Sequence, residues 1–74
     1  MKTLSIKQKM LLEAIDWYIK ENGYSPTFRE LADLLDSDVN SVFKKALVLE
    51  EKGYITTVPS KARTIKIIKE LPDD

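Results

Sequence analysis

The sequence contains no cysteine and no histidine among its 74 residues. It therefore has no disulfide, no thiolate nucleophile, no histidine general base and no ordinary zinc site. Because small secreted domains usually depend on disulfides, the lack of cysteine favours a reducing compartment, and we expect a cytoplasmic protein. No apolar run approaches the roughly 20 residues of a membrane span, and the first residues lack the apolar region of a signal peptide. We therefore expect no membrane association.

The chain also lacks net charge, since 12 basic residues balance 12 acidic ones. The charges are unevenly distributed, however. Residues 40–69 contain seven lysine and arginine residues against two glutamates, a net charge of +5. Residues 1–39 contain five basic and seven acidic side chains, a net charge of −2. The basic residues thus gather in the second half of the chain, as on a nucleic-acid-binding surface.

The length of the chain allows one domain, over residues 1–74, with a small core. A chain of this size buries only about 60% of its unfolded surface. Nearly every large apolar residue is therefore expected to be structural. Scattered carboxylates are expected to stay solvated, because so small a domain lacks a pocket that would shift their pKa values.

Two capping boxes mark the first two helices. Ser5 with Gln8 precedes apolar residues at helical spacing, and Gly23 follows them, which predicts a helix over about residues 6–22. Trp17 falls near Ile6 and Met10 on this helix and is expected in the core or at its edge. Thr27 with Glu30 predicts a short second helix over about residues 28–35.

A very short turn then leads into a third helix. Asp36 and Ser37 form this turn, in which Ser37 can cap the helix that follows. The third helix is predicted over about residues 38–52, and Gly53 ends it. Two helices joined by such a short turn form a helix-turn-helix unit.

After Gly53 the pattern changes to that of strands. Residues 54–58 are β-branched and aromatic, residues 59–62 resemble a turn, and residues 63–68 suit a returning strand. This hairpin, over about residues 54–68, would be a wing, and residues 69–74 are expected to fray. The predicted fold is mainly α with a small β-hairpin (α+β): a winged helix-turn-helix with three helices and a two-stranded wing.

The third helix separates into two faces when plotted at about 100° per residue. One face is expected to pack on the first two helices and contains Val39, Val42, Ala46 and Leu49. The other projects Asn40, Ser41, Lys44, Lys45 and Val48, with Lys52 one turn further on. An asparagine can pair with adenine, and a lysine can bind guanine acceptors or phosphates. We predict that Asn40, Ser41 and Lys44 read bases, whereas Lys45, Lys61 and Arg63 hold phosphates.

Several stretches resemble the N-terminal domain of LexA-type repressors. They are Leu4-Ser5 before a long helix, residues 23–27 (Gly-Tyr-Ser-Pro-Thr), 29–32 (Arg-Glu-Leu-Ala), 49–55 (Leu-Glu-Glu-Lys-Gly-Tyr-Ile) and 63–65 (Arg-Thr-Ile). The resemblance covers about residues 4–68. It implies a small prokaryotic or phage transcriptional regulator that binds double-stranded DNA, with helix 38–52 in the major groove and hairpin 54–68 on the DNA backbone. Thr27 would begin the helix whose N-terminus approaches a phosphate.

Three features depart from this family. Asp36 stands after the second helix, where the family usually has glycine, and Asp38 begins the third helix, where a carboxylate would repel phosphate. Phe43, Leu47 and Val48 replace polar or small residues. This apolar edge can be part of the core, or it can make the domain a protein-interaction module that docks a partner or a second copy. The lack of net charge, Asp38 and the acidic tail favour the second alternative.

We expect no catalysis, no cofactor, no bound metal and no small-molecule substrate. The spacing of Ser41 and Lys44 matches serine-lysine acylating enzymes, but the companion motifs are absent. Residues 36–40 imitate the start of a calcium loop. Ser41 and Leu47 then stand where the loop requires glycine and glutamate, so the cage cannot close.

Overall fold

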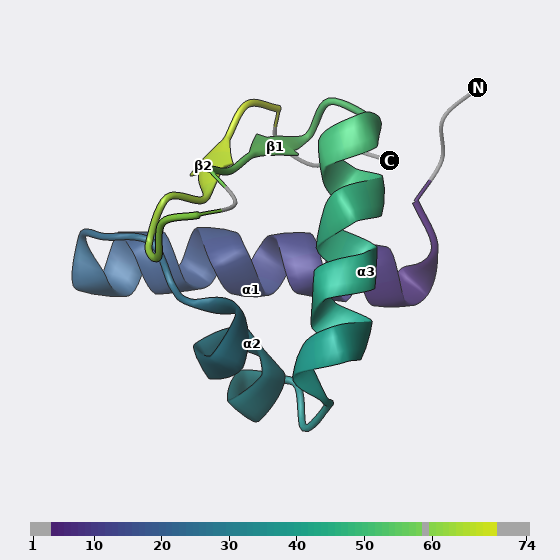
Figure 1. The fold of residues 1–74 in the computed structure, drawn as a ribbon, viewed down its shortest axis with the longest axis horizontal. Helices are drawn as coiled ribbons and strands as arrows, with labels where there is room; N and C mark the ends of the chain where they lie inside the picture. Colours follow the sequence, from purple (N-terminus) through teal and green to yellow (C-terminus); the bar gives the residue numbers. More distant parts are fainter. Residues whose placement is uncertain (1–3, 59, 70–74) are drawn as a thin grey trace.

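The computed structural model describes residues 4–58 and 60–69. The elements follow in the order α1 (Ile6–Asn22), α2 (Phe28–Leu34), α3 (Val39–Glu51), β1 (Ile55–Thr56) and β2 (Lys66–Ile67). This confirms the predicted fold class of three helices and a two-stranded wing. In Figure 1, α3 runs across α1, with α2 and the hairpin beside it. No helix in the described part of the chain is long and apolar enough to cross a membrane.

Both predicted capping boxes are present. The side chains of Ser5 and Thr27 each accept a hydrogen bond from the backbone N–H three residues later. The side chains of Gln8 and Glu30 in turn accept from the backbone N–H of Ser5 and Thr27. The prediction for α3 is wrong in one detail, because Asp38 caps it instead of Ser37. The backbone N–H of Ser37 donates to Ala32 O at 2.9 Å, so this residue still closes the end of α2.

Asp36 lies in the turn between α2 and α3 with a φ of 52°. This left-handed conformation favours glycine, but aspartate tolerates it better than most other residues. The backbone N–H of Asp36 also donates to Asp33 O at 3.3 Å. The turn therefore keeps its geometry without the glycine expected from the family.

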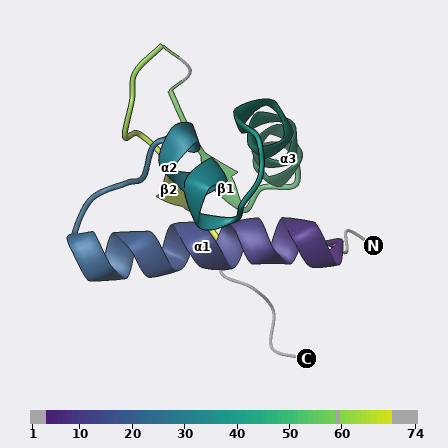
Figure 2. The same ribbon diagram turned by 90° about the horizontal axis from the view of Figure 1, so that it is seen from below.

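The core draws residues from all three helices and from both sides of the hairpin. Its buried apolar members are Leu4, Leu11, Leu12, Ile15, Leu31, Ala32, Val42, Ala46, Leu49, Tyr54, Ile55 and Ile65. Figure 2 shows α2, α3 and the hairpin on one side of α1. Within residues 4–58 and 60–69, no element covers the opposite side of α1.

Two predictions about the core are wrong. Trp17 is 52% exposed, and Ile6 and Met10 are exposed with it, because they lie on the uncovered side of α1. Val39 is 37% exposed although the rest of its predicted face is buried. Side chains on a helix tilt toward its N-terminus, so the first residue of α3 points past the helix end and away from the core.

The wing has much shorter strands than the sequence predicts. Among the described residues of the hairpin, only Ile55 pairs with Ile67 and Thr56 with Lys66, in antiparallel register. Beyond them the Thr64 side chain replaces the backbone ladder: its Oγ1 accepts from Val58 N at 2.9 Å and donates to Lys61 O at 3.1 Å. On the other side, the N–H of Lys69 donates to Tyr54 O, and residues 70–74 of the predicted tail lie outside the described residues.

Candidate nucleic-acid interface

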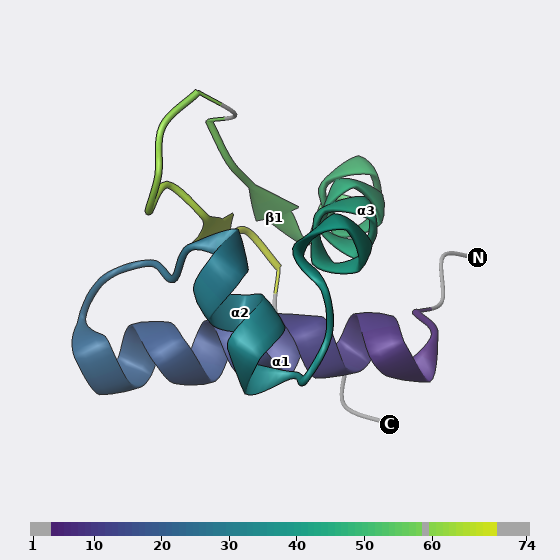
Figure 3. The same cartoon turned by 60° about the horizontal axis from the view of Figure 1, so that its bottom comes forward.

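The basic elements share one side of the molecule. Figures 2 and 3 show α2, α3 and the wing rising from the same side of α1. This face contains the outer surface of α3, the N-terminus of α2 and the tip of the wing. It is the face to which the sequence analysis assigned DNA.

The outer surface of α3 follows from its buried side. Val42, Ala46 and Leu49 point into the core, with at most 2% of each side chain exposed. The opposite side presents Asn40, Lys44 and Leu47, which recur at intervals of four and three residues and are all exposed. An amide, an ammonium group and an apolar side chain therefore lie in one row.

The helical wheel predicted that Ser41 and Lys45 project from α3 into solvent. In the structure both residues are half-buried. The hydroxyl of Ser41 donates to Asp38 Oδ1 at 2.7 Å, and its backbone N–H donates to Asp38 Oδ2 at 3.0 Å. These two bonds hold the pKa of the Asp38 carboxyl below its usual value. Asp38 is thus the N-cap of α3, and the hydroxyl of Ser41 is occupied by its hydrogen bond to this cap.

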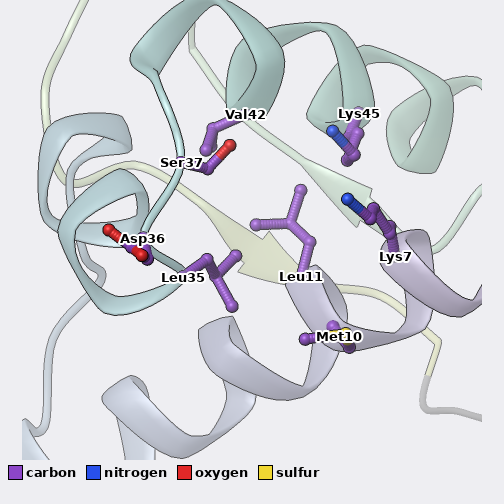
Figure 4. A pocket seen from close by; sticks show the side chains of 8 residues that line it. All are labelled: Lys7, Met10, Leu11, Leu35, Asp36, Ser37, Val42 and Lys45. Carbon is purple, nitrogen blue, oxygen red and sulfur yellow. The ribbon is translucent and has the colours of Figure 1, made fainter.

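Lys45 lies at the border between α3 and α1. A hollow of about 120 Å³ opens between α1, the α2–α3 turn and α3, and its lining includes Lys7, Asp36 and Lys45. In Figure 4 the side chains of Lys7 and Lys45 lie on the same side of this hollow. Further along α3, the Lys52 ammonium group donates to Gln8 Oε1 at 3.4 Å. The lysines on this flank of α3 therefore lie beside α1.

The wing and the start of α2 enclose a second hollow, of about 270 Å³. Its lining brings together Thr27, Lys61 and Arg63, which the sequence analysis selected from two distant segments. Lys61 is exposed. Thr27 has its hydroxyl in the capping box, where it accepts from Glu30 N at 3.1 Å. The three residues are thus neighbours around one concave surface.

Arg63 joins the wing to α2. Its guanidinium donates to both carboxylate oxygens of Glu30, at 3.0 and 2.9 Å, and to Ser25 O at 3.1 Å. The guanidinium carbon also lies 4.9 Å from the centre of the Tyr24 ring, which adds a cation–π contact. Sequence analysis assigned Glu30 only to the capping box. No local pattern signals a pair of residues 33 positions apart.

The ion pair shifts the ionisation of both partners. The hydrogen bonds from Arg63, followed by the backbone hydrogen bond within the Thr27 capping box, lower the pKa of Glu30 from 4.5 to about 2. The same pair raises the pKa of Arg63 above its already high value. Glu30 therefore remains ionised under all ordinary conditions, and the attachment of the wing does not change around neutral pH.

We expect acid to weaken this attachment. A carboxylate with a lowered folded-state pKa stabilises the fold fully above its ordinary pKa, and this contribution disappears as the pH falls from about 4.5 toward 2. The Glu30→Gln variant keeps a capping side chain but lacks the charge. Its melting temperature should be below that of the wild type at pH 6, and the difference should shrink below pH 4.5. Exposed Glu13→Gln on α1 is the control, and a Glu30 difference that does not depend on pH would contradict the assignment.

Phe43 and Leu47 form an apolar part of the outer surface of α3. They are 42% and 48% exposed, so the alternative that places them in the core is wrong for both. Val48 is half-buried. The Phe43 ring meets the ring of Phe28, the first residue of α2, edge to face at a centroid distance of 5.5 Å. This contact fixes the Phe43 side chain at the junction of the two helices.

Three helices, a two-stranded wing and an exposed α3 define a winged helix-turn-helix domain of the DNA-binding class. A family model described as the LexA DNA binding domain matches residues 1–64. The chain therefore belongs to the LexA DNA-binding domain family, and the predicted sequence-specific DNA binding is confirmed.

Relatives of the chain are LexA repressors. It is 42% identical over 69 residues to the LexA repressor of Thermosipho africanus (strain TCF52B), covering 93% of this chain and 35% of that protein. It is 35% identical over 72 residues to that of Leptospira interrogans (serogroup Icterohaemorrhagiae serovar copenhageni), covering 97% and 36%. With that of Erythrobacter litoralis it shares 38% over 72 residues, covering 96% and 30%. The chain thus spans about a third of the length of these relatives.

Proposed function

We propose that this chain binds operator DNA as the recognition domain of a prokaryotic or phage transcriptional repressor in the cytoplasm, with no catalytic role. In this arrangement α3 enters the major groove and the wing follows the phosphate backbone. The observation that supports it is the exposed row on α3, which lies on the same face as the wing and the start of α2. A winged domain that grips DNA needs these elements to reach one duplex together.

The outer row of α3 supplies the base contacts. Asn40 lies in the first turn of α3, the part of a recognition helix that meets base edges, and its amide can pair with adenine. Lys44 is one turn further and can reach guanine acceptors or a phosphate. Ser41 reads a base only if its hydroxyl leaves Asp38, so its main contribution is to position the first turn.

The flanking elements supply the phosphate contacts. Lys61, which is exposed on the wing, and Lys45, at the border with α1, carry positive charge on either side of the row. Thr27 places the backbone N–H groups at the start of α2 toward the same face. Arg63 reaches phosphate only in competition with Glu30, so we assign it chiefly to holding the wing in place. Such contacts give affinity without base preference.

Two substitutions separate these roles in an anisotropy titration with duplex DNA. Lys61→Ala should weaken binding to all duplexes alike and reduce the slope of log K against log salt by about 1. Asn40→Ala should instead lose preference at one base pair, by about 1–3 kcal/mol. Lys9→Ala, on the exposed side of α1, is the matched control. Unchanged binding by both Lys61→Ala and Asn40→Ala would contradict the assignment.

The exposed Phe43 and Leu47 also favour a second candidate function, docking of a protein partner or of a second copy. Sedimentation distinguishes the two. A dimer that becomes a monomer on Phe43→Ala supports docking through this edge. A wild-type monomer that does not respond to the change supports DNA as the occupant.

A further inference from the structure

Leu47 lies within the row that the proposed function assigns to DNA, and Phe43 lies directly beside that row. Leu47 lies three residues after Lys44, and Phe43 lies three residues after Asn40 and adjoins Lys44 along the chain. At helical spacing these four side chains form one continuous surface. The two apolar groups therefore cannot avoid the duplex if Asn40 and Lys44 meet bases.

The polar residues of this row have an obvious binding partner, but the apolar ones do not. An exposed leucine and an exposed phenylalanine gain little from phosphate or from the polar base edges. The major groove presents one apolar group, the 5-methyl group of thymine, and side chains such as phenylalanine contact it. Cytosine and the purines have no such group in the groove.

We propose that Phe43 and Leu47 are specificity-determining residues that contact thymine 5-methyl groups in the major groove. This inference rests on the proposed function, because it requires α3 in the groove. The Phe28 ring supports Phe43 from α2, so the aromatic ring is held in place before DNA arrives and its rotamer freedom is not lost on binding. Asn40 beside it adds a preference for adenine. The target site then contains thymine at one or two positions next to the adenine.

The occupant of this surface is DNA and not a protein because of the charges around it. Lys44 lies beside the adjacent pair Phe43 and Leu47 on this surface, and Lys61 on the wing lies on the same face. Lysines beside an apolar pair are complementary to a duplex, whose phosphates flank the methyl groups of the groove, and the exposed Glu51, four residues after Leu47, marks the end of this basic surface. A protein-docking edge would instead bury Lys44 at a cost unless a partner carboxylate met it.

Uracil tests this inference, because it pairs as thymine does but lacks the methyl group. A duplex is first selected from a random pool by the purified chain. Its thymines are then replaced by deoxyuridine one at a time, and each affinity is measured by anisotropy. At one or two positions, the replacement should weaken binding by the wild type about three- to fourfold. This is the change expected from one methyl group that is no longer buried.

Variants decide whether Phe43 and Leu47 cause this loss. Leu47→Ala and Phe43→Ala should each lose the sensitivity to uracil at one position and keep the salt dependence of the wild type. Leu34→Ala on α2 is the matched control, because Leu34 is 47% exposed and lies outside the row. It should keep the full sensitivity. Circular dichroism confirms that each variant is folded.

Several results would overturn the inference. Wild-type binding that does not respond to uracil at any position excludes contact with a methyl group, although the proposed function survives if the binding still depends on salt. A uracil effect that remains in both Leu47→Ala and Phe43→Ala would belong to the DNA and not to these side chains. No binding to any duplex would overturn the proposed function as well, and a wild-type dimer lost on Leu47→Ala would then assign the surface to a second copy.

Discussion

DNA binding by this chain should weaken by about two orders of magnitude when the salt concentration rises from 50 to 200 mM. Lys44, Lys45 and Lys61 are candidate phosphate contacts, and Arg63 adds a fourth when its guanidinium leaves Glu30 for a phosphate. Each contact releases counterions from the duplex and adds roughly −0.9 to the slope of log K against log salt. Four contacts give a slope of about −4, which corresponds to that loss over a fourfold change in salt.

Anisotropy titrations with a random duplex at several salt concentrations measure this slope. Removing one phosphate contact by Lys61→Ala should make the slope less steep by about 1. Arg63 offers a sharper comparison, because its guanidinium is bound to Glu30. If it contacts no phosphate, Arg63→Ala lowers the affinity by displacing the wing but keeps much of the slope. The absence of binding even at 50 mM salt would favour the protein-interaction function.

Replacing Ser25 by alanine should destabilise the domain by about 1–3 kcal/mol, the cost of a buried polar group that loses its partner. The buried Ser25 hydroxyl accepts from the backbone N–H of Ile65 at 3.0 Å and donates to Pro26 O at 2.9 Å. Alanine would leave the N–H of Ile65 without a partner inside the core. In a domain of this size the melting temperature falls by roughly 4–8 °C for each kcal/mol.

Thermal unfolding followed by circular dichroism tests this prediction. The exposed Ser60 in the wing serves as the control, and Ser60→Ala should leave the melting temperature nearly unchanged. Ser25→Ala should also weaken DNA binding, because the hydroxyl holds the wing to the segment between α1 and α2. A melting temperature equal to that of the wild type would show that the N–H of Ile65 is satisfied in another way.

Local signals in the sequence determined the elements of this protein. Ser5 with Gln8 and Thr27 with Glu30 are pairs three residues apart, so both helix starts could be recognised from their neighbours alone. The short turn before α3 and the change of pattern after Gly53 likewise predicted the winged helix-turn-helix. The family motifs are also short stretches, and they led to the same class of protein.

The tertiary structure decided which side chains are accessible and which are paired. Arg63 was expected on phosphate, but it binds Glu30, 33 residues away in the chain. Trp17 was expected in the core, but α2 and α3 cover the other side of α1 and leave it exposed. Periodicity shows that a helix has two faces but not which neighbour covers each one. Pairing and exposure depend on how the helices and the wing pack together, and no local stretch of the sequence contains that information.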